Sequence, residues 1–248
     1  HSNKMKDHRQ IGRELDLFSF HQYAPGAIFW HPKGWTVYKT LVDFIRATIE
    51  PYGYQEIATP VVVKSKLFEK SGHLEHFKEN MFLLKVENEN YSLKPMNCPE
   101  STIIYSSKTR SYNDLPLRLS EFGILHRNEL SGVLGGAFRA RQFTIDDAHL
   151  FVRPDQIQEE IHQLLLLVID VYKSLGFKPR FYLATRPDKA MGDKKSWEEA
   201  ESDLGRALKN AKVNFDIKPK DGAFYGPKID IHINDSQDRD WQLATIQL

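Results

Sequence analysis

Cysteine and long apolar runs are scarce in this sequence, and each scarcity excludes a class of protein. The lone cysteine, Cys98, cannot form an internal disulfide, which is typical of a reducing compartment, so we expect a cytoplasmic protein. No apolar run approaches the roughly 20 residues that cross a bilayer. The longest candidate, LLLLVIDVY from Leu164, is interrupted by Asp170. The first residues also lack the apolar segment of a signal peptide, so we expect no membrane role.

An excess of charge of either sign is missing as well. The 34 basic and 33 acidic residues leave a formal net charge of +1, which provides no global positive field to attract nucleic acid. Contact with nucleic acid must then be local, or be made by a part of the protein outside this sequence. What the chain does have is 41% hydrophobic and 12% aromatic residues, enough to bury the core of one large domain.

The first half of the chain predicts helices and strands in mixed order. Apolar residues at helical spacing follow Gly34, and Pro51 with Gly53 end this helix. The stretch YQEIATPVVV is typical of a strand ended by Pro60, because proline has no N–H for a strand ladder. NMFLLKVENENYSLKPM alternates around ENEN and predicts a β-hairpin. Two further predicted strands, PLRLSEFGILHR and ARQFTIDDAHLFV, flank a charged loop.

The second half predicts two helices and several strands. The stretch from Pro154 to Gly176 has proline and acids at its start and glycine at its end, which predicts a long helix. SWEEAESDLGRALKNA predicts the other helix, and strands are predicted in KPRFYLATRP, FDIKPKDGAFYGPKIDIHIND and DWQLATIQL. Strands joined mostly by hairpins, with segregated helices, predict an α+β fold with an antiparallel β-sheet flanked by helices.

The loop between the two central strands is unusually rich in charge. Between Ile124 and Phe151, arginines, histidines and acidic residues surround a group of glycines. A solvated hairpin whose charges pair with each other would explain this composition. A site for an anionic ligand would explain it equally, because guanidinium groups bind carboxylate and phosphate bidentately without losing their charge. The loop alone leaves both interpretations open.

Several motifs together carry a resemblance that runs from about Asp7 to Leu248. EIATP, FGILHRNE, FRARQF and DWQLATIQL resemble the first two signature motifs of the class II aminoacyl-tRNA synthetases and the approach to the third. KPMNCPE, DDAH, ATRP and GAFYGPKIDI are similar to the threonyl-tRNA synthetases within that class. The resemblance implies a single catalytic domain over residues 1–248 that stops within the third motif, with editing and anticodon-binding domains absent from this sequence.

The resemblance also implies roles for four residues in binding ATP. Arg127 would bind the α-phosphate and the substrate carboxylate and act in catalysis, and Arg139 would reach the γ-phosphate. Glu129 would accept a hydrogen bond from the adenine amino group, and Phe143 would stack on adenine. Mg²⁺ would accompany ATP.

For zinc and threonine, the resemblance again implies specific positions. Cys98 and His149 match two of the family's three zinc ligands, although each alone is more often an ordinary core or hydrogen-bonded residue. A third ligand, a histidine, is expected beyond Leu248, as is the third-motif arginine that covers adenine. Zinc with three protein ligands keeps an open position, filled in this family by the substrate's amino group and hydroxyl. The remaining threonine-binding residues that the resemblance implies are Met96, Asp147, Tyr225, Lys228 and Gln242.

Two departures from the family pattern lie near these positions. Ile145 stands where the family commonly has a glutamine, so one polar contact to the substrate is lost or supplied elsewhere. The stretch LAT from Leu243 replaces a more usual Cys-Gly-Thr, a change that a strand tolerates because the residues are small or apolar.

The function implied by the resemblance is that of a threonine-tRNA ligase core, an enzyme that activates threonine with ATP and transfers it to the 3′ end of threonine tRNA. One alternative is a synthetase-like paralogue that acts as a non-catalytic binding or regulatory module. Another is a class II enzyme for serine or proline, against which Cys98 and DDAH weigh. The first motif, through Pro60, implies a homodimer, because it forms a two-fold interface in this class.

Overall fold

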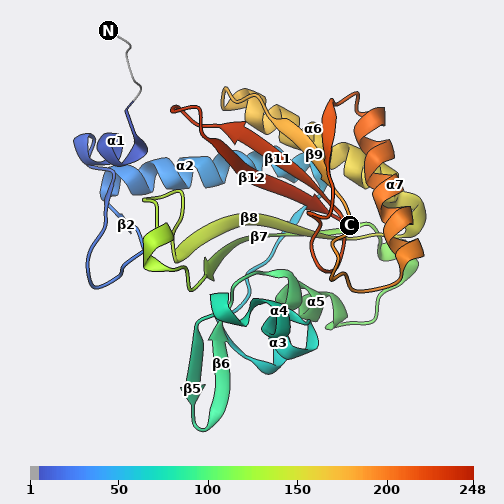
Figure 1. The fold of residues 1–248 in the computed structure, drawn as a ribbon, viewed down its shortest axis with the longest axis horizontal. Helices are drawn as coiled ribbons and strands as arrows, with labels where there is room; N and C mark the ends of the chain where they lie inside the picture. Colours follow the sequence, from blue (N-terminus) through green and yellow to red (C-terminus); the bar gives the residue numbers. More distant parts are fainter. Residues whose placement is uncertain (1–5) are drawn as a thin grey trace. The chain divides into compact units, whose positions relative to one another are not determined.

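The computed structural model describes residues 6–248, which form two compact units, residues 6–151 and 152–248 (Figure 1). The first unit is built on two ten-residue antiparallel strands, β7 (Leu117–His126) and β8 (Gln142–Phe151). A short strand, β3 (Gln55–Glu56), pairs with β7 in parallel and completes a three-stranded sheet. Since side chains alternate along a strand, the odd-numbered residues of β7 and β8 share one face of this sheet.

Helix α2 (Pro32–Ile49) packs on the even-numbered face. The Tyr38 hydroxyl donates to Thr144 Oγ1 at 2.9 Å, and the Arg46 guanidinium lies 5.1 Å from the centre of the Phe122 ring. The helix begins at a proline, where the missing N–H is not needed, and the 3₁₀ helix η1 (Glu50–Tyr52) continues it to Gly53, whose φ is 74°. The helix predicted after Gly34 is therefore confirmed.

The odd-numbered face is covered by the segment that leads into helix α5 (Cys98–Ser106). Asn97 lies directly over Gly123, where a Cβ atom would come within 2.1 Å of its side-chain oxygen. On the same face Lys94 donates to Glu121 Oε1 at 2.9 Å, and both side chains are almost fully buried. Thr59, next to Pro60, donates to the same carboxylate from its backbone N–H and its hydroxyl. This buried polar cluster joins three chain segments.

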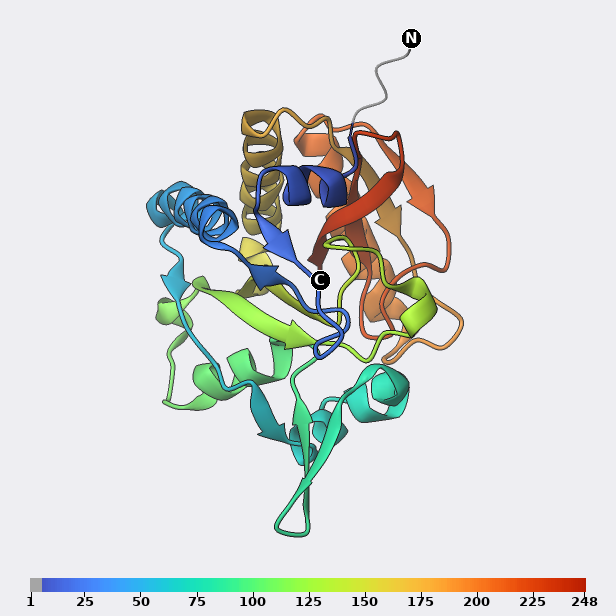
Figure 2. The same ribbon diagram turned by 90° about the vertical axis from the view of Figure 1, so that its left-hand side faces the viewer.

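A second small sheet in this unit has the order β4-β6-β5. Its hairpin turns at Glu87 and Asn88, both with positive φ, which is the geometry of a tight two-residue turn. Figure 2 shows this hairpin extending from the rest of the unit. The other elements of the unit are α1 (His8–Glu14), β1 (Phe18–Ser19), β2 (Phe29–Trp30), β4 (Val62–Lys64), α3 (Lys66–Lys70), α4 (His73–Phe77), η2 (Lys78–Asn80), β5 (Leu83–Val86), β6 (Glu89–Leu93), η3 (Tyr112–Asp114) and η4 (Ser131–Val133).

The second unit is a four-stranded sheet in the order β10-β9-β11-β12, with two helices packed on one face (Figure 1). Ile229 and Ile231 of β11 are buried with Leu165 and Leu204 of these helices, and Ile233 on the same strand is also buried. The bounds of the unit's elements are η5 (Pro154–Gln156), α6 (Ile157–Ser174), β9 (Arg180–Ala184), α7 (Lys194–Asn210), β10 (Phe215–Lys218), β11 (Lys228–Asn234) and β12 (Asp240–Gln247).

The predicted α+β class is confirmed, and the structure refines its details. The pairs β3–β7 and β9–β10 are parallel, so the two sheets that contain them are mixed rather than wholly antiparallel. The stretch around Pro60 forms two short strands instead of one, and the predicted strand from Phe215 is interrupted between Lys218 and Lys228. Within residues 6–248 no helix is both long and apolar enough to span a bilayer.

Candidate functional site

Arg127 directly follows the last residue of β7, and its side chain lies over two aromatic rings. The guanidinium lies 5.2 Å from the centre of the Phe143 ring and 5.7 Å from that of Phe77. Its Nε donates to the Pro95 carbonyl at 3.2 Å, and its backbone N–H donates to the Arg141 carbonyl at 2.8 Å. The aromatic faces and the carbonyl orient the planar group. The structure thus brings together Arg127 and Phe143, two of the residues expected to bind ATP.

The other two expected ATP ligands form an ion pair. Arg139 donates to Glu129 Oε2 from Nε at 3.1 Å and from a terminal nitrogen at 3.0 Å. The side chain of Arg139 is 54% exposed, so this pair stabilises the loop only weakly. Glu129 and Arg139 begin and end the charged loop, and their pairing holds its two sides together.

Asp147 is oriented by Asn97, a residue of the KPMNCPE motif for which the family resemblance implied no role. Asn97 Nδ2 donates to Asp147 Oδ2 at 3.1 Å, and Asn97 is fully buried. The carboxylate can accept but the amide oxygen cannot donate, so this bond determines which way the amide points. Ile145, the departure from the family pattern, lies on the same face of β8 and pairs with Gly123 beneath Asn97.

Cys98 begins α5, immediately after Asn97. Burial, and then the nearby Asp147 carboxylate, raise the pKa of the Cys98 thiol to about 12. His149 lies two residues beyond Asp147 on the same face of β8 and pairs with Leu119. Met96 is half-buried in the segment before α5. Phe143, Asp147 and His149 therefore share one face of the β7–β8 sheet, and Met96 and Cys98 flank Asn97, which lies over that face.

Among residues 6–248, no three histidine, cysteine or acidic side chains lie close enough together to hold a metal ion. His73 and His126, which we considered as further ligands beside Cys98 and His149, each contact another polar side chain. His73 Nδ1 is 2.8 Å from Ser71 Oγ, and His126 Nε2 is 3.1 Å from Gln142 Oε1. These residues do not make a zinc site by themselves, and a third ligand beyond Leu248 stays a prediction.

Glu100, the last residue of the KPMNCPE motif and part of the first turn of α5, is a buried carboxyl group for which the motif implied no role. It is 3% exposed, and within the described part of the chain neither oxygen has a hydrogen-bond partner. Burial raises its pKa to about 7, the nearby Glu121 adds to the shift, and Lys94 opposes it. Because the folded pKa exceeds the unfolded value of about 4.5, Glu100 favours folding least at high pH.

We expect Glu100→Gln to remove a pH-dependent loss of stability. The wild-type protein should lose free energy of unfolding between about pH 4.5 and pH 7, by on the order of 3 kcal/mol for a shift of this size, because the carboxyl group ionises in the unfolded chain while it stays protonated in the folded protein. Urea denaturation of both proteins at pH 5 and pH 8 measures the difference. Equal pH dependence in the variant and the wild type would contradict this account.

The second unit holds the other three expected residues, and Asp230 joins two of them. Asp230 is fully buried on β11; its Oδ2 forms an ion pair with Lys228 Nζ at 2.9 Å, and its Oδ1 accepts from Gln242 Nε2 at 2.8 Å. The alternation of polar residues with isoleucine in KIDIHIN was the signal that could have identified Asp230 from the sequence. Tyr225, the third of these residues, is 43% exposed, and its hydroxyl donates to Gln247.

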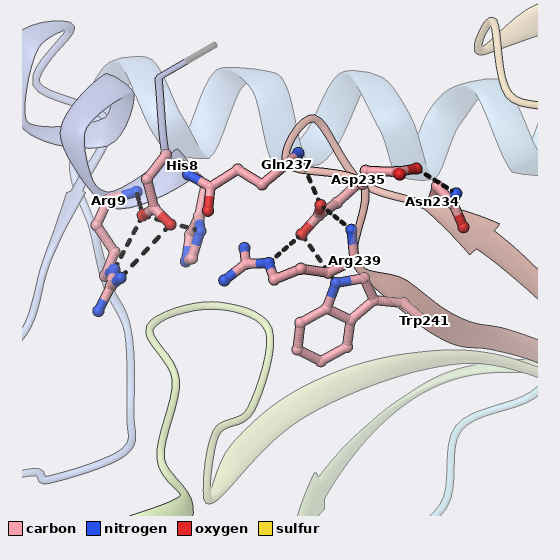
Figure 3. A network of polar contacts seen from close by, with 9 residues as sticks. His8, Arg9, Asn234, Asp235, Gln237, Arg239 and Trp241 are labelled. Atoms are coloured by element: carbon pink, nitrogen blue, oxygen red, sulfur yellow. Dashed lines mark hydrogen bonds and ion pairs between the residues drawn. The ribbon is translucent and has the colours of Figure 1, made fainter. Parts of the chain in front are cut away.

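The turn before β12 is fixed by Asp235 (Figure 3). Its carboxylate accepts the backbone N–H groups of Gln237 and Arg239 at 2.8 and 3.0 Å and the Trp241 indole N–H at 2.9 Å. Burial acts to raise the pKa of Asp235, but these hydrogen bonds outweigh it and keep the pKa well below the ordinary value. This rigid turn sets the start of the strand that carries Gln242.

Comparison with known proteins identifies the class. Residues 82–248 match the family described as the tRNA synthetase class II core domain (G, H, P, S and T), and the chain belongs to this family. The match extends across both compact units, and a single catalytic domain over residues 1–248 stays a prediction. A prolyl-tRNA synthetase structure from Giardia lamblia, covering 96% of this chain and 43% of its own, has a TM-score of 0.74 at 16% identity and supports the fold alone.

Relatives with high sequence identity include threonine-tRNA ligases. The chain is 49% identical to a threonine-tRNA ligase from Caldanaerobacter subterraneus and 48% identical to one from Acetivibrio thermocellus, over 99% of its own length in both cases. It spans only 38% and 39% of those relatives. A crystal structure titled as the RNA binding domain of threonyl-tRNA synthetase from Cryptosporidium parvum has a TM-score of 0.95 at 44% identity, covering 98% of this chain and 61% of its own.

Proposed function

We propose that this chain is the catalytic core of a threonine-tRNA ligase. Its membership of the class II core family and its near 50% identity to threonine-tRNA ligases over 99% of its length carry the proposal. The reaction is attack of the threonine carboxylate on the α-phosphorus of ATP, which gives threonyl-adenylate and pyrophosphate. The threonyl group is then transferred to the 3′ end of threonine tRNA, and a cytoplasmic location belongs to the same proposal.

Arg127 would neutralise the repulsion between the two reacting anions. A guanidinium oriented by the rings of Phe77 and Phe143 can bridge the α-phosphate and the carboxylate while charge builds on phosphorus. Glu129 would accept from the adenine amino group, Arg139 would bind the γ-phosphate and Phe143 would stack on adenine. Mg²⁺ bound with the ATP would neutralise further phosphate charge.

Asp147 would recognise the amino group and hydroxyl of threonine, since Asn97 fixes its carboxylate in one orientation. Met96, Tyr225, Lys228 and Gln242 would contribute the remaining contacts, with Asp230 orienting Lys228 and Gln242. Cys98 and His149 would supply two of three zinc ligands.

Threonine-dependent exchange between pyrophosphate and ATP tests the proposal directly. We expect exchange with threonine and not with proline. A protein that binds ATP and threonine but catalyses no exchange would instead be the non-catalytic module, a second function that the departure at Ile145 keeps open.

We further propose a homodimer formed through the first motif. Helix α2 exposes Trp35, Val37 and Leu41, which are 44%, 59% and 47% accessible, and an apolar surface of this kind favours burial against a second copy. Sedimentation at micromolar concentration should show a dimer, and Val37→Arg with Leu41→Arg should give a monomer. Ile217→Arg, at another exposed apolar position, is the control and should remain dimeric. A monomeric wild-type protein would contradict the proposal.

A further inference from the structure

Helix α1 contacts the tip of the charged loop that the Glu129–Arg139 ion pair closes. His8 Nε2 accepts the backbone N–H of Ala137 at 3.0 Å, and the His8 ring packs edge-on against Phe138 with 4.3 Å between ring centres. The side chain of His8 is 20% exposed. Nothing in the signature motifs involves this histidine, which lies 129 residues away from the loop in sequence.

The backbone of the loop is adapted to this contact at Gly136. Its φ is 60°, and a Cβ atom there would lie 2.4 Å from His8 Nε2 and 2.9 Å from Arg9 Cγ. A Cβ atom at this position would require the side chains of His8 and Arg9 to shift from these contacts. The helix itself is fixed at its start, because the Asp7 carboxylate accepts the Arg9 N–H at 2.9 Å (Figure 3).

Other contacts fix the base of the same loop. Arg141 Nε donates to the Glu129 carbonyl at 2.9 Å, and the backbone N–H of Arg141 donates to the Gly26 carbonyl at 2.6 Å. At the tip, Gly135 N–H donates to the Arg139 carbonyl at 3.0 Å. If ATP takes over both Glu129 and Arg139, their mutual ion pair is lost. The hydrogen bond from Ala137 to His8 then remains as a side-chain attachment of the tip.

We propose that His8 is a positioning residue that holds the loop over the nucleotide, so that Glu129 and Arg139 meet ATP already in place. The ATP-binding roles of Glu129 and Arg139 in this inference rest on the proposed function. The contact between His8 and the loop does not depend on it. A preorganised loop binds its ligand without the cost of ordering it. His8 therefore acts on nucleotide affinity and leaves the chemical step to Arg127.

Three variants of the full chain separate this role from a general loss of structure. His8→Ala removes the acceptor and the ring; His8→Gln keeps a side-chain acceptor; Gln10→Ala, on the same helix, removes an exposed side chain that bonds Glu14. Amide hydrogen exchange of residues 130–139 without substrates reports the attachment. In pyrophosphate exchange, the KM for ATP shows whether attachment of the loop affects nucleotide binding, and the KM for threonine serves as the comparison.

In His8→Ala we expect loop exchange to accelerate and the KM for ATP to rise by roughly three- to tenfold, the effect of losing one hydrogen bond and its ring contact. The KM for threonine should stay unchanged, His8→Gln should recover part of the effect, and Gln10→Ala should behave as wild type. Unchanged loop exchange in His8→Ala overturns the proposal. Faster exchange with an unchanged KM for ATP overturns the role in nucleotide binding. If the wild-type protein itself catalyses no pyrophosphate exchange, the proposed function fails, and the loop measurement still decides whether His8 holds the tip.

Discussion

Replacing Arg127 by lysine should lower the rate of adenylate formation by on the order of 10²- to 10³-fold, although the positive charge is retained. Lysine has no planar fork and cannot bridge a phosphate and a carboxylate, and it cannot stack in the same way between the rings of Phe77 and Phe143. Because the lost interaction is made in the transition state, kcat and kcat/KM should fall together. Single-turnover formation of the adenylate is the measurement.

Arg110 provides a matched control for this substitution. Its guanidinium also lies over an aromatic ring, 5.2 Å from the centre of Tyr105, and its Nε also donates to a backbone carbonyl, at 2.8 Å. Arg110→Lys therefore removes similar packing outside the candidate site and should leave the rate of adenylate formation close to that of wild type. An undiminished rate in Arg127→Lys would exclude Arg127 from the proposed role.

The protein should discriminate against valine far more strongly than against serine. Valine has the shape of threonine without the hydroxyl, and a site that binds this hydroxyl through Asp147 leaves a buried polar group unpaired, so rejection by about 10⁴- to 10⁵-fold in kcat/KM is expected. Serine keeps the hydroxyl and lacks one methyl group. The loss of that methyl group should lower kcat/KM by only roughly 10- to 200-fold. Pyrophosphate exchange with the three amino acids measures both ratios.

The variant that tests this recognition is Asp147→Asn, with Asp146→Asn as its neighbour control. Asp147 faces Asn97, whereas Asp146 belongs to the opposite face of β8 because side chains alternate along a strand. We expect Asp147→Asn to lose most of the preference for threonine over valine and Asp146→Asn to keep it. Activation of valine as readily as serine by the wild-type protein would show that Asp147 does not recognise the hydroxyl.

The strands that carry the candidate site could be predicted from the sequence because their signals are local. Alternation in β7 and β8 places Phe143, Asp147 and His149 on one face without any knowledge of the tertiary fold. The long helices were likewise marked by their own termini. These signals depend only on residues close together in the chain.

What could not be predicted depends on contacts between distant segments. Helix α5 gave no periodic signal, and the need for glycine at position 123 arises only because Asn97 lies over it. The pairing of Lys94 with Glu121, the raised pKa of Glu100 and the contact of His8 with Ala137 are equally non-local. The roles of the individual site residues came from the family resemblance, because a charged loop by itself does not show what it binds.

The ion pair between Glu129 and Arg139 has a consequence for the way in which nucleotide enters. With one partner largely in water, the pair is weak, and dissolved salt screens it further. Each side chain keeps its position by contacting the other, and if both bind ATP as proposed, the nucleotide should displace the pair at little energetic cost. The empty protein and the proposed nucleotide complex should then share nearly the same loop shape. Raising the ionic strength should weaken both the Glu129–Arg139 ion pair and the attraction of Arg139 for phosphate.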